Sequence, residues 1–458
     1  MNTDDSATHT IMNWPQIVNW SIGTVGPVAI LYLVSSGFMI YMTDVVGLSG
    51  LIAGALIAGV RVYDMFVDPL MGRLSDRTRS RMGRRRPWML AGAIVMTLGS
   101  IALFSVPATR TGQSTTPQII WTLAALLIYF TGYSMFNVPY MAMPAEMTDG
   151  YHDRTRLMSA RVIFVSLSSL IGAATAPRLI QAFGGGAAAY QLTAGAIGML
   201  GLLAMLYCVS ATKFAKATAA SAATQPLLMQ IKIIASNRPF VMLVMSKLML
   251  LLSMSSLTSS LWYMVQHVLH RDLNTASNIS AAQTAGMLLC LPLWLQIAKA
   301  RSKSRLFVLA SIGSTAVLLS WMLVTPLAAM FSLVLRGFLL GAFAGGALLM
   351  GQSMLPDTME FDFRRTGERR EGTYSGFYSV VEKAGFAIGP PIIGFMLSAA
   401  GYVGLAHGEG PVQLSAAAVR AVYWGVSIIP ALATIAAMLP MRFYTLTEAS
   451  LKSTDRGS

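Results

Sequence analysis

The chain has 458 residues, of which 55% are hydrophobic and only 11% are charged. A soluble domain carries about 25% charged residues, so this composition leaves too few polar side chains to cover a water-facing surface. It excludes a cytosolic enzyme, a secreted disulfide scaffold and a disordered chain, and it favours a protein that crosses the membrane many times.

Twelve stretches are long and apolar enough to span a bilayer as helices, which takes roughly 20 residues each. We predict them at 16–42, 48–72, 88–107, 117–143, 157–183, 190–212, 239–265, 278–298, 305–325, 327–353, 373–400 and 416–440. Strands are excluded because a membrane strand alternates polar and apolar residues over about ten positions.

A polar, basic segment separates the first six stretches from the last six. An Arg-rich loop follows the second stretch and the basic loop KARSKSR follows the eighth, which indicates two related halves. The sequence therefore predicts an all-α membrane protein with 12 transmembrane helices in two pseudo-symmetric six-helix bundles. We expect a tail at 1–15, a bundle at 16–212, a linker at 213–238, a second bundle at 239–440 and a tail at 441–458.

The positions of the basic residues predict the orientation. Of the 33 Lys and Arg residues, 24 lie in segments expected on one side, and only Arg110, Arg271 and Arg420 lie in loops on the other. Basic loops stay in the cytoplasm, so we expect both tails and the linker to be cytoplasmic and the chain to lie in the inner (plasma) membrane. The net charge of +14 is then a topology signal, and no nucleic-acid partner is expected.

Charged residues inside the predicted spans are costly in hydrocarbon and normally face a bundle interior or a water-filled cavity. Asp64 and Asp68 are spaced i, i+4, so both carboxylates lie on one face of a helix, about 6 Å apart along its axis. Two such carboxylates need a bound cation, a proton or a basic partner to remain in the membrane. They form either a cation-coupling site or a pair, neutralised by Arg61 and Lys383, that only holds the bundles together.

Lys383 lies in the middle of the eleventh stretch, and we expect its partner to be the Asp64/Asp68 pair; the alternative is snorkelling to the interface. Lys247 lies only two turns into its stretch, and we expect it to snorkel. Arg161 is a candidate either for clamping an anionic or hydroxyl-rich substrate group or for closing a cytoplasmic gate. Arg178 and Arg336 are expected to be structural.

The fourth stretch carries Tyr133, Asn137 and Tyr140 on one helical face, suited to stacking on sugar rings or to packing against neighbouring helices. The GxxxG spacings Gly50/Gly54 and Gly341/Gly345 predict close helix contacts. All five histidines fall in predicted loops or tails, so we expect no proton relay through histidine. We also find no metal-ligand cluster, no nucleotide-binding loop and no nucleophile–base pair, and we expect no cofactor beyond a coupling ion.

The loop GRLSDRTRSRMGRRRPW resembles the helix II–III loop of the major facilitator superfamily. More narrowly, RVYDMFVDP, YMTDVVGLSG, NVPYMAMPAEMTD and LPDTMEFDFRRTGERREGTYSGFYSVVEKAGFAIGPPIIG resemble the glycoside–pentoside–hexuronide:cation symporter family, the melibiose permease group. These segments span both halves of the chain. The resemblance implies H⁺- or Na⁺-coupled symport of a sugar or glycoside by a rocking movement of two bundles.

By position, the resemblance implies a cation site at Asp64, Asp68 and Ser134 with Lys383 nearby. It implies sugar contacts at Tyr133, Asn137 and Arg161, to which we add Tyr140 and Lys383 as substrate-binding candidates. The chain departs from the family at Val28 and Asn137, where that group has acids that bind the sugar. It also has Val67 in place of a polar residue beside the second acid, which favours a proton over sodium.

Cytoplasmic gate contacts are expected from the Arg-rich loop, Arg84 included, with the acids Asp76, Glu146, Asp149 and Asp357. The expected partners are a small-molecule substrate of the glycoside class and the lipid bilayer, and the expected state is a monomer. Two alternatives stay open: a transporter of a lysolipid or another amphipathic solute, and a membrane sensor or scaffold that does not transport. The first is favoured by the apolar first helix, and the second is opposed by the retained acids and Lys383.

Overall fold

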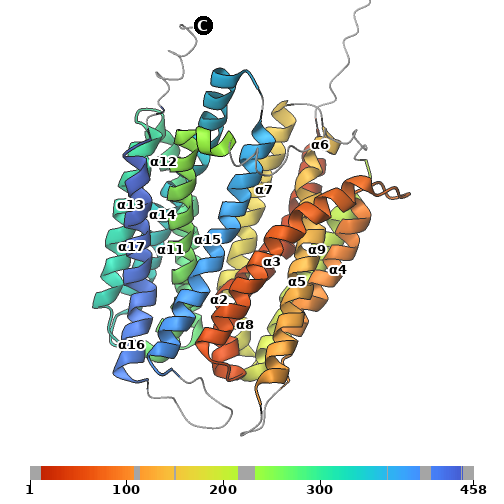
Figure 1. Ribbon diagram of the computed structural model, residues 1–458. Coiled ribbons are helices and arrows are strands. Elements are labelled where there is room, and N and C mark those ends of the chain that lie inside the picture. Colours follow the sequence, from red (N-terminus) through yellow and green to blue (C-terminus); the bar gives the residue numbers. More distant parts are fainter. Residues whose placement is uncertain are drawn as a thin grey trace, which may run out of the picture.

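The computed structural model describes residues 12–107, 114–148, 151–214, 233–368, 370–402, 414–444 and 446. Every regular element within these ranges is helical, and 12 helices are long and apolar enough to cross a membrane. This confirms the predicted fold class. Several spans contain a tighter or wider turn, which divides one membrane crossing into consecutive labelled pieces (Figure 1).

The first six spans form the N-terminal bundle, defined here as residues 14–211. Their pieces are α1 (Trp14–Ser21), η1 (Ile22–Thr24), α2 (Val25–Ile40) and η2 (Tyr41–Val45); α3 (Gly50–Arg77); α4 (Arg86–Leu103); α5 (Thr116–Ala142), followed by the short α6 (Pro144–Met147); α7 (Tyr151–Leu170), η3 (Ile171–Thr175) and α8 (Ala176–Ala182); and α9 (Gly186–Ala211).

The last six spans form the C-terminal bundle, defined as residues 238–441. Their pieces are α11 (Arg238–Tyr263) and η4 (Met264–Val268); α12 (Leu273–Ala298); α13 (Lys303–Ser320) and η5 (Trp321–Leu323); α14 (Met330–Thr366); α15 (Glu371–Ala399); and α16 (Ala416–Tyr423), η6 (Trp424–Ile428) and α17 (Ile429–Met441).

The largest departure from the predicted bounds is α14, which continues 13 residues past the predicted end at 353. Its 37 residues extend about 56 Å, more than the full thickness of a bilayer. The added part, Met354–Thr366, alternates acidic, basic and apolar residues, so a criterion based on apolar length alone misses it. The helix ends where Gly367 adopts a left-handed conformation, with a φ of 71°.

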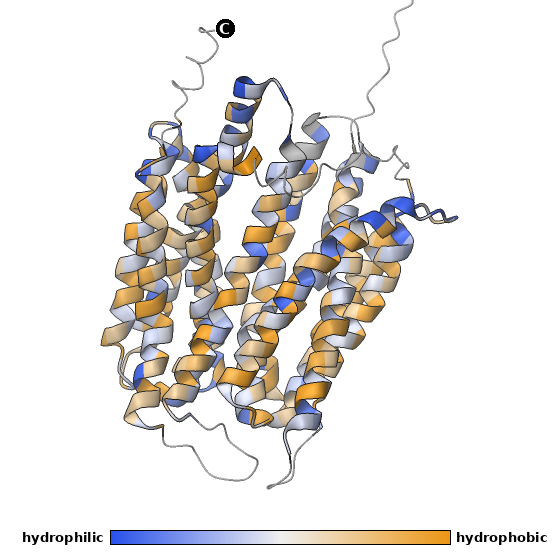
Figure 2. Cartoon of the chain, viewed as in Figure 1, coloured by the Kyte–Doolittle hydropathy of each residue, from blue (hydrophilic) through white to orange (hydrophobic). Residues whose placement is uncertain are grey.

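We call the end of the molecule that carries the Arg-rich loop between α3 and α4 the basic side (top of Figure 1), and the other end the opposite side. Hydrophilic residues gather at the basic side in Figure 2. The helices α3 and α15 approach each other most closely toward the opposite side (Figure 1). There a Cβ on Gly50 would lie 2.8 Å from the carbonyl oxygen of Gly394, and one on Gly54 would lie 2.7 Å from the Cα of Pro391. The expected close contact at Gly50/Gly54 is therefore present, and it joins the two bundles.

Candidate functional site

Two carboxylates, one ammonium and one hydroxyl meet where α3, α5 and α15 approach one another. The Lys383 Nζ lies 2.7 Å from Asp64 Oδ2 and 2.5 Å from Asp68 Oδ2. The Ser134 hydroxyl lies 2.9 Å from Asp64 Oδ1 and 2.6 Å from Asp68 Oδ1. The four side chains thus close a ring, which we call the acid–lysine ring.

The local sequence positions this ring. The i, i+4 spacing places Asp64 and Asp68 on one face of α3, one turn apart, and that face packs on α5, which supplies Ser134. Asp64 is fully buried, whereas 24% of the Asp68 side chain is exposed. Solvent therefore reaches the ring at Asp68.

The acid–lysine ring contains fewer positive charges than carboxylates and fewer hydroxyl protons than carboxylate acceptors. One ammonium faces two carboxylates, so with both acids ionised the ring carries a net charge of −1. Ser134 has a single hydroxyl proton, so it donates to only one of its two carboxylate neighbours at a time. A further proton or cation would neutralise the ring.

Arg61, the other basic residue considered as a neutralising partner, lies elsewhere. Its guanidinium carbon stacks over the Phe130 ring, 4.7 Å from the ring centroid, and its side chain is buried. In the part of the chain that the structure describes, Lys383 is the basic group that pairs directly with both acids.

The candidate substrate residues fall into two environments. Tyr133, Asn137 and Arg161 are each partly exposed. Tyr140, by contrast, is buried: its ring stacks on Trp20 at 4.7 Å, and its hydroxyl lies 2.7 Å from the Thr24 hydroxyl. In this conformation Tyr140 packs α5 against α1 and is closed to a ligand.

The candidate gate residues pair within their own bundles. Glu146 accepts hydrogen bonds of 2.6 Å from Arg84 and from Arg85, and Arg85 also lies 3.5 Å from Asp76. Asp357 pairs with Lys303 of its own bundle at 2.7 Å. Asp149 lies outside the described residues. These contacts brace the basic ends of each bundle separately.

A second charged cluster joins α11 to α15, and sequence reasoning missed it. Lys247 Nζ lies 3.1 Å from Glu382 Oε2 and 3.4 Å from the centroid of the Tyr378 ring. Only 3% of the Lys247 side chain is exposed, so the expected snorkelling is wrong. The signal available was a glutamate in the middle of a span, which needs a basic partner.

A third cluster, which we call the latch, joins the two bundles at the opposite side. His267 Nε2 lies 2.6 Å from Asp44 Oδ2, and the Tyr402 hydroxyl donates to Asp44 Oδ1 at 2.5 Å. Burial and the Asp44 carboxylate raise the pKa of Tyr402, so its hydroxyl stays protonated as a donor. The expectation that all histidines lie in loops or tails is wrong for two of them. His152 lies in the first turn of α7, and His267 lies in η4, because its helix continues as a wide turn through Val268.

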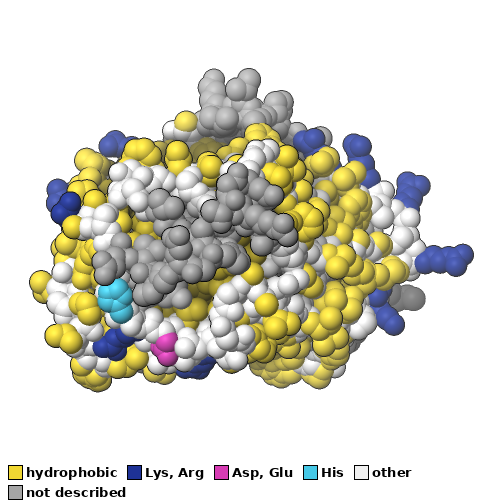
Figure 3. Space-filling view, turned by 90° about the horizontal axis from the view of Figure 1, so that it is seen from below, with side chains coloured by type: hydrophobic (Ala, Val, Ile, Leu, Met, Phe, Trp, Pro, Cys, Tyr) yellow, Lys and Arg dark blue, Asp and Glu magenta, His cyan; other side chains and the backbone are white. Residues whose placement is uncertain are grey.

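Further contacts between the bundles lie near the latch. They include the hydroxyl contact of Thr43 with Tyr263 at 2.7 Å, the bond from the Leu51 amide to Ser398, and the bond from Arg178 to Asn278. The contacts named here lie at the opposite side, whereas those of Lys383 with Asp64 and Asp68 join the bundles at the acid–lysine ring. Seen from the opposite side, the molecule presents mostly hydrophobic side chains with charged ones at the rim (Figure 3).

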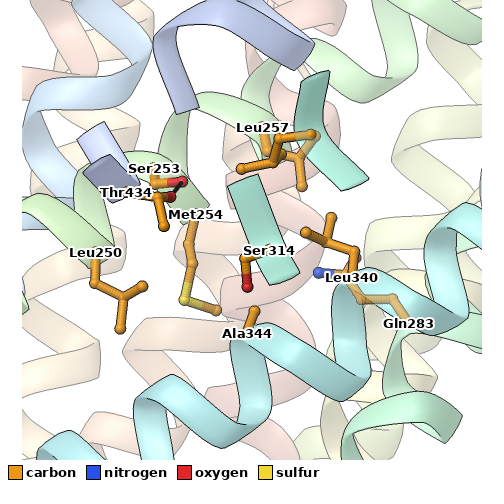
Figure 4. Close-up of a pocket in the computed structure, with 10 residues that line it drawn as sticks. Leu250, Ser253, Met254, Leu257, Gln283, Ser314, Leu340, Ala344 and Thr434 are labelled. Atoms are coloured by element: carbon orange, nitrogen blue, oxygen red, sulfur yellow. Dashed lines mark hydrogen bonds between the residues drawn. The ribbon is translucent and has the colours of Figure 1, made fainter. Parts of the chain in front are cut away.

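A small pocket lies inside the C-terminal bundle (Figure 4). Its volume of about 20 Å³ holds about one water molecule. The hydroxyls of Ser253 and Thr434 bond to each other across it at 2.9 Å, and the Ser314 hydroxyl has no protein partner. A water bonded to Ser314 fits this space, whereas an organic substrate does not.

Comparison with known proteins gives consistent matches along the chain. A family model described as MFS/sugar transport protein matches residues 20–448. The uncharacterized symporter YnaJ of Bacillus subtilis is 28% identical, over 92% of this chain and 89% of that protein. The isoprimeverose transporter of Lactiplantibacillus pentosus is 26% identical over 85% and 81%, and the glucuronide carrier protein homolog of Escherichia coli is 25% identical over 96% and 94%.

Solved structures share the fold at low sequence identity. A bacterial homolog of the human lysosomal transporter Spinster, in an inward-facing and unoccupied conformation, superimposes with a TM-score of 0.68 at 13% identity, covering 94% of this chain and 96% of that one. A structure from work on proton-dependent oligopeptide transporters gives 0.67 at 10% identity, covering 97% and 100%.

Proposed function

The chain belongs to the MFS/sugar transport protein family, as a multi-pass membrane transporter and not an enzyme, and we propose that it couples the entry of a proton to the uptake of a glycoside. The observation that carries this proposal is the acid–lysine ring. It holds two acids and one ammonium in the middle of the membrane, and it takes up one further positive charge.

A proton fits the ring better than sodium does. If Asp68 is protonated, it donates to Ser134 Oγ at 2.6 Å, and Ser134 is then free to donate to Asp64 at 2.9 Å. Every group in the ring then has a partner without any movement. Sodium needs several oxygen ligands, and beside the second acid the chain supplies the apolar Val67, which is buried.

Release of Lys383 links the ion to movement of the bundles. Lys383 is on α15 of one bundle and both acids are on α3 of the other, so the ion pairs hold the bundles together. Neutralising one acid weakens this attraction. The bundles then rock about the central site, which is the alternating-access scheme of secondary transporters.

The contacts between the bundles support a state that is closed at the opposite side, and we propose that this state is open at the basic side. Basic loops face the cytoplasm, so the described conformation is inward-facing, with both tails cytoplasmic and the chain in the inner membrane. The likeness to an inward-facing structure agrees with this assignment.

The proposed substrate is a glycoside that contacts Tyr133, Asn137 and Arg161, the partly exposed candidates on α5 and α7. Relatives named for transport of isoprimeverose and of glucuronide support this substrate class. We propose that the chain acts as a monomer.

The test uses the purified protein in proteoliposomes with radiolabelled methyl glycosides. An inward proton gradient should drive accumulation by the wild type. Asp68→Asn should abolish accumulation but retain exchange of labelled for unlabelled sugar, because the neutral amide imitates the protonated acid and cannot release its proton. Glu360→Gln, in an exposed pair with Arg364, is the control and should accumulate normally.

Two outcomes would contradict the proposal. Full accumulation of the sugar by Asp68→Asn would show that the acid–lysine ring does not couple the ion to transport. If a sodium gradient drives accumulation and a proton gradient does not, the coupling ion is sodium. Lysophosphatidylcholine is included as a competitor, since strong inhibition by it would favour the amphipathic substrate instead.

A further inference from the structure

Glu382 is the most exposed carboxylate that the structure describes inside the membrane-spanning helices. Its side chain is 46% exposed, although it lies next to Lys383 near the middle of α15. Its partner Lys247 is 3% exposed, and the Lys247 ammonium also lies over the ring of Tyr378, one turn before Glu382 on the same face of α15. The ammonium is thus buried, and the carboxylate is the part of the pair that a ligand can reach.

The neighbours of α15 show which way Glu382 faces. Lys383, about 100° away around the helix, contacts α3, and Gly385 and Gly389 pack on Leu251 and Ser255 of α11. Glu382 therefore lies in the angle between α3 and α11, on the side between the bundles. The large exposed apolar residues of α15, Val380, Ile388 and Phe395, lie on a different face.

Two exposed serines continue the same face toward the basic side. Ser375, Ser379 and Glu382 are spaced i, i+4, i+7, which aligns them along one stripe of the helix, and both serines are exposed. In the inward-facing state proposed above, this stripe lies on the side from which a ligand enters or leaves. It presents two hydroxyls and one carboxylate to whatever enters between the bundles.

We propose that Glu382, fixed by Lys247 and Tyr378, is a substrate-binding residue of the C-terminal bundle that accepts hydrogen bonds from hydroxyls of a neutral, polyhydroxylated ligand. This inference rests on the proposed function and deepens it.

The charges of the cluster favour hydroxyls over a charged group. Lys247 already balances the charge of Glu382, so the pair offers little net attraction to a cation. The carboxylate has about four acceptor sites, and Lys247 uses one of them. Two neighbouring hydroxyls of a ligand can donate hydrogen bonds to the remaining acceptor sites of the Glu382 carboxylate. The hydroxyls of Ser375 and Ser379, on the same stripe, can each donate and accept a further hydrogen bond.

The experiment measures equilibrium binding in nanodiscs without a gradient. The probes are methyl β-D-glucopyranoside, methyl β-D-galactopyranoside and methyl β-D-xylopyranoside, followed by the monodeoxy analogues of the tightest binder. Glu382→Gln should weaken binding by about 10- to 100-fold, the usual effect of losing hydrogen bonds to a charged acceptor. Glu360→Gln is the matched control, since its carboxylate is 45% exposed and also ion-paired, but it lies near the basic end of α14.

The deoxy analogues separate direct contact from a structural effect. One analogue should bind the wild type weakly, and Glu382→Gln should weaken its binding no further, because the hydroxyl that meets Glu382 is already missing. Lys247→Arg should keep binding within about threefold of the wild type, and Lys247→Met should lose it. An unchanged affinity in Glu382→Gln, or equal losses for every analogue, would overturn the inference.

The same data distinguish a failure of this inference from a failure of the proposed function. If the wild type binds and accumulates a probe but Glu382→Gln behaves like Glu360→Gln, only the inference fails. If the wild type binds none of the three probes, both fail.

Discussion

The ammonium nitrogen of Lys383 lies 2.7 Å from the Asp64 carboxylate, and this ion pair spans the interface between the two bundles. Asp64 is completely buried, so the pair replaces hydration that the Asp64 carboxylate cannot recover while the bundles stay together. Removing one partner of a buried ion pair costs about 3 to 5 kcal/mol, because the other charge is left without compensation. The ring is therefore both a contact between the bundles and a place where one added charge changes that contact.

Replacement of Lys383 by Met should lower the melting temperature, and more so at pH 8 than at pH 5.5. Without the ammonium the two carboxylates repel each other when ionised, and a proton relieves that repulsion as the pH falls. Differential scanning fluorimetry at the two pH values measures the effect. Lys303→Met, which removes a more exposed pair with Asp357, is the control and should show little pH dependence. A loss of stability that is equal at both pH values would argue against ionised acids in the ring.

Breaking the latch should favour opening of the opposite side. Asp44→Asn weakens the contact with His267, and His267→Leu removes it, so both variants should increase the outward-open population. Spin labels at Ser114 and Thr325, exposed positions on the opposite side of each bundle, report the separation by pulsed electron resonance once Cys208 and Cys290 are replaced.

His270→Asn is the matched control for the latch. His270 is exposed and has a φ of 49°, a conformation that Asn tolerates, so the distance distribution should match the wild type. Unchanged distances in Asp44→Asn and His267→Leu would mean that the latch does not hold the opposite side closed.

A single methyl group at Gly394 should impair closure of the opposite side. Its Cβ would overlap the Gly50 carbonyl oxygen, and neither backbone can yield while α3 and α15 remain packed. We expect Gly394→Ala to express normally, to transport less than a tenth as fast as the wild type, and to lengthen the same spin-label distance. Gly59→Ala, on α3 with nothing within 4 Å of its added carbon, should transport normally. Normal transport by both variants would show that this close contact is dispensable.

Features that depend on local chemistry could be predicted from the residues alone. Apolar length predicted 12 spans, because each must cover a fixed thickness of hydrocarbon. The one-turn spacing of Asp64 and Asp68 placed both acids on one face before any partner was known. Lys383 was correctly paired with them because a lysine in the middle of a span needs an acid.

Which groups meet across helices that are far apart in the chain could not be predicted in this way, because it depends on how the helices pack. Glu382 is adjacent to Lys383, yet its side chain turns to Lys247 on α11 while that of Lys383 turns to α3, since neighbouring residues on a helix point about 100° apart. His267 lies two residues past the predicted end of its span at 265, and its place in a buried cluster depends on Asp44 and Tyr402, 223 and 135 residues away. Sequence periodicity gives the direction of a side chain around its own helix, whereas its partner is set by how the helices pack.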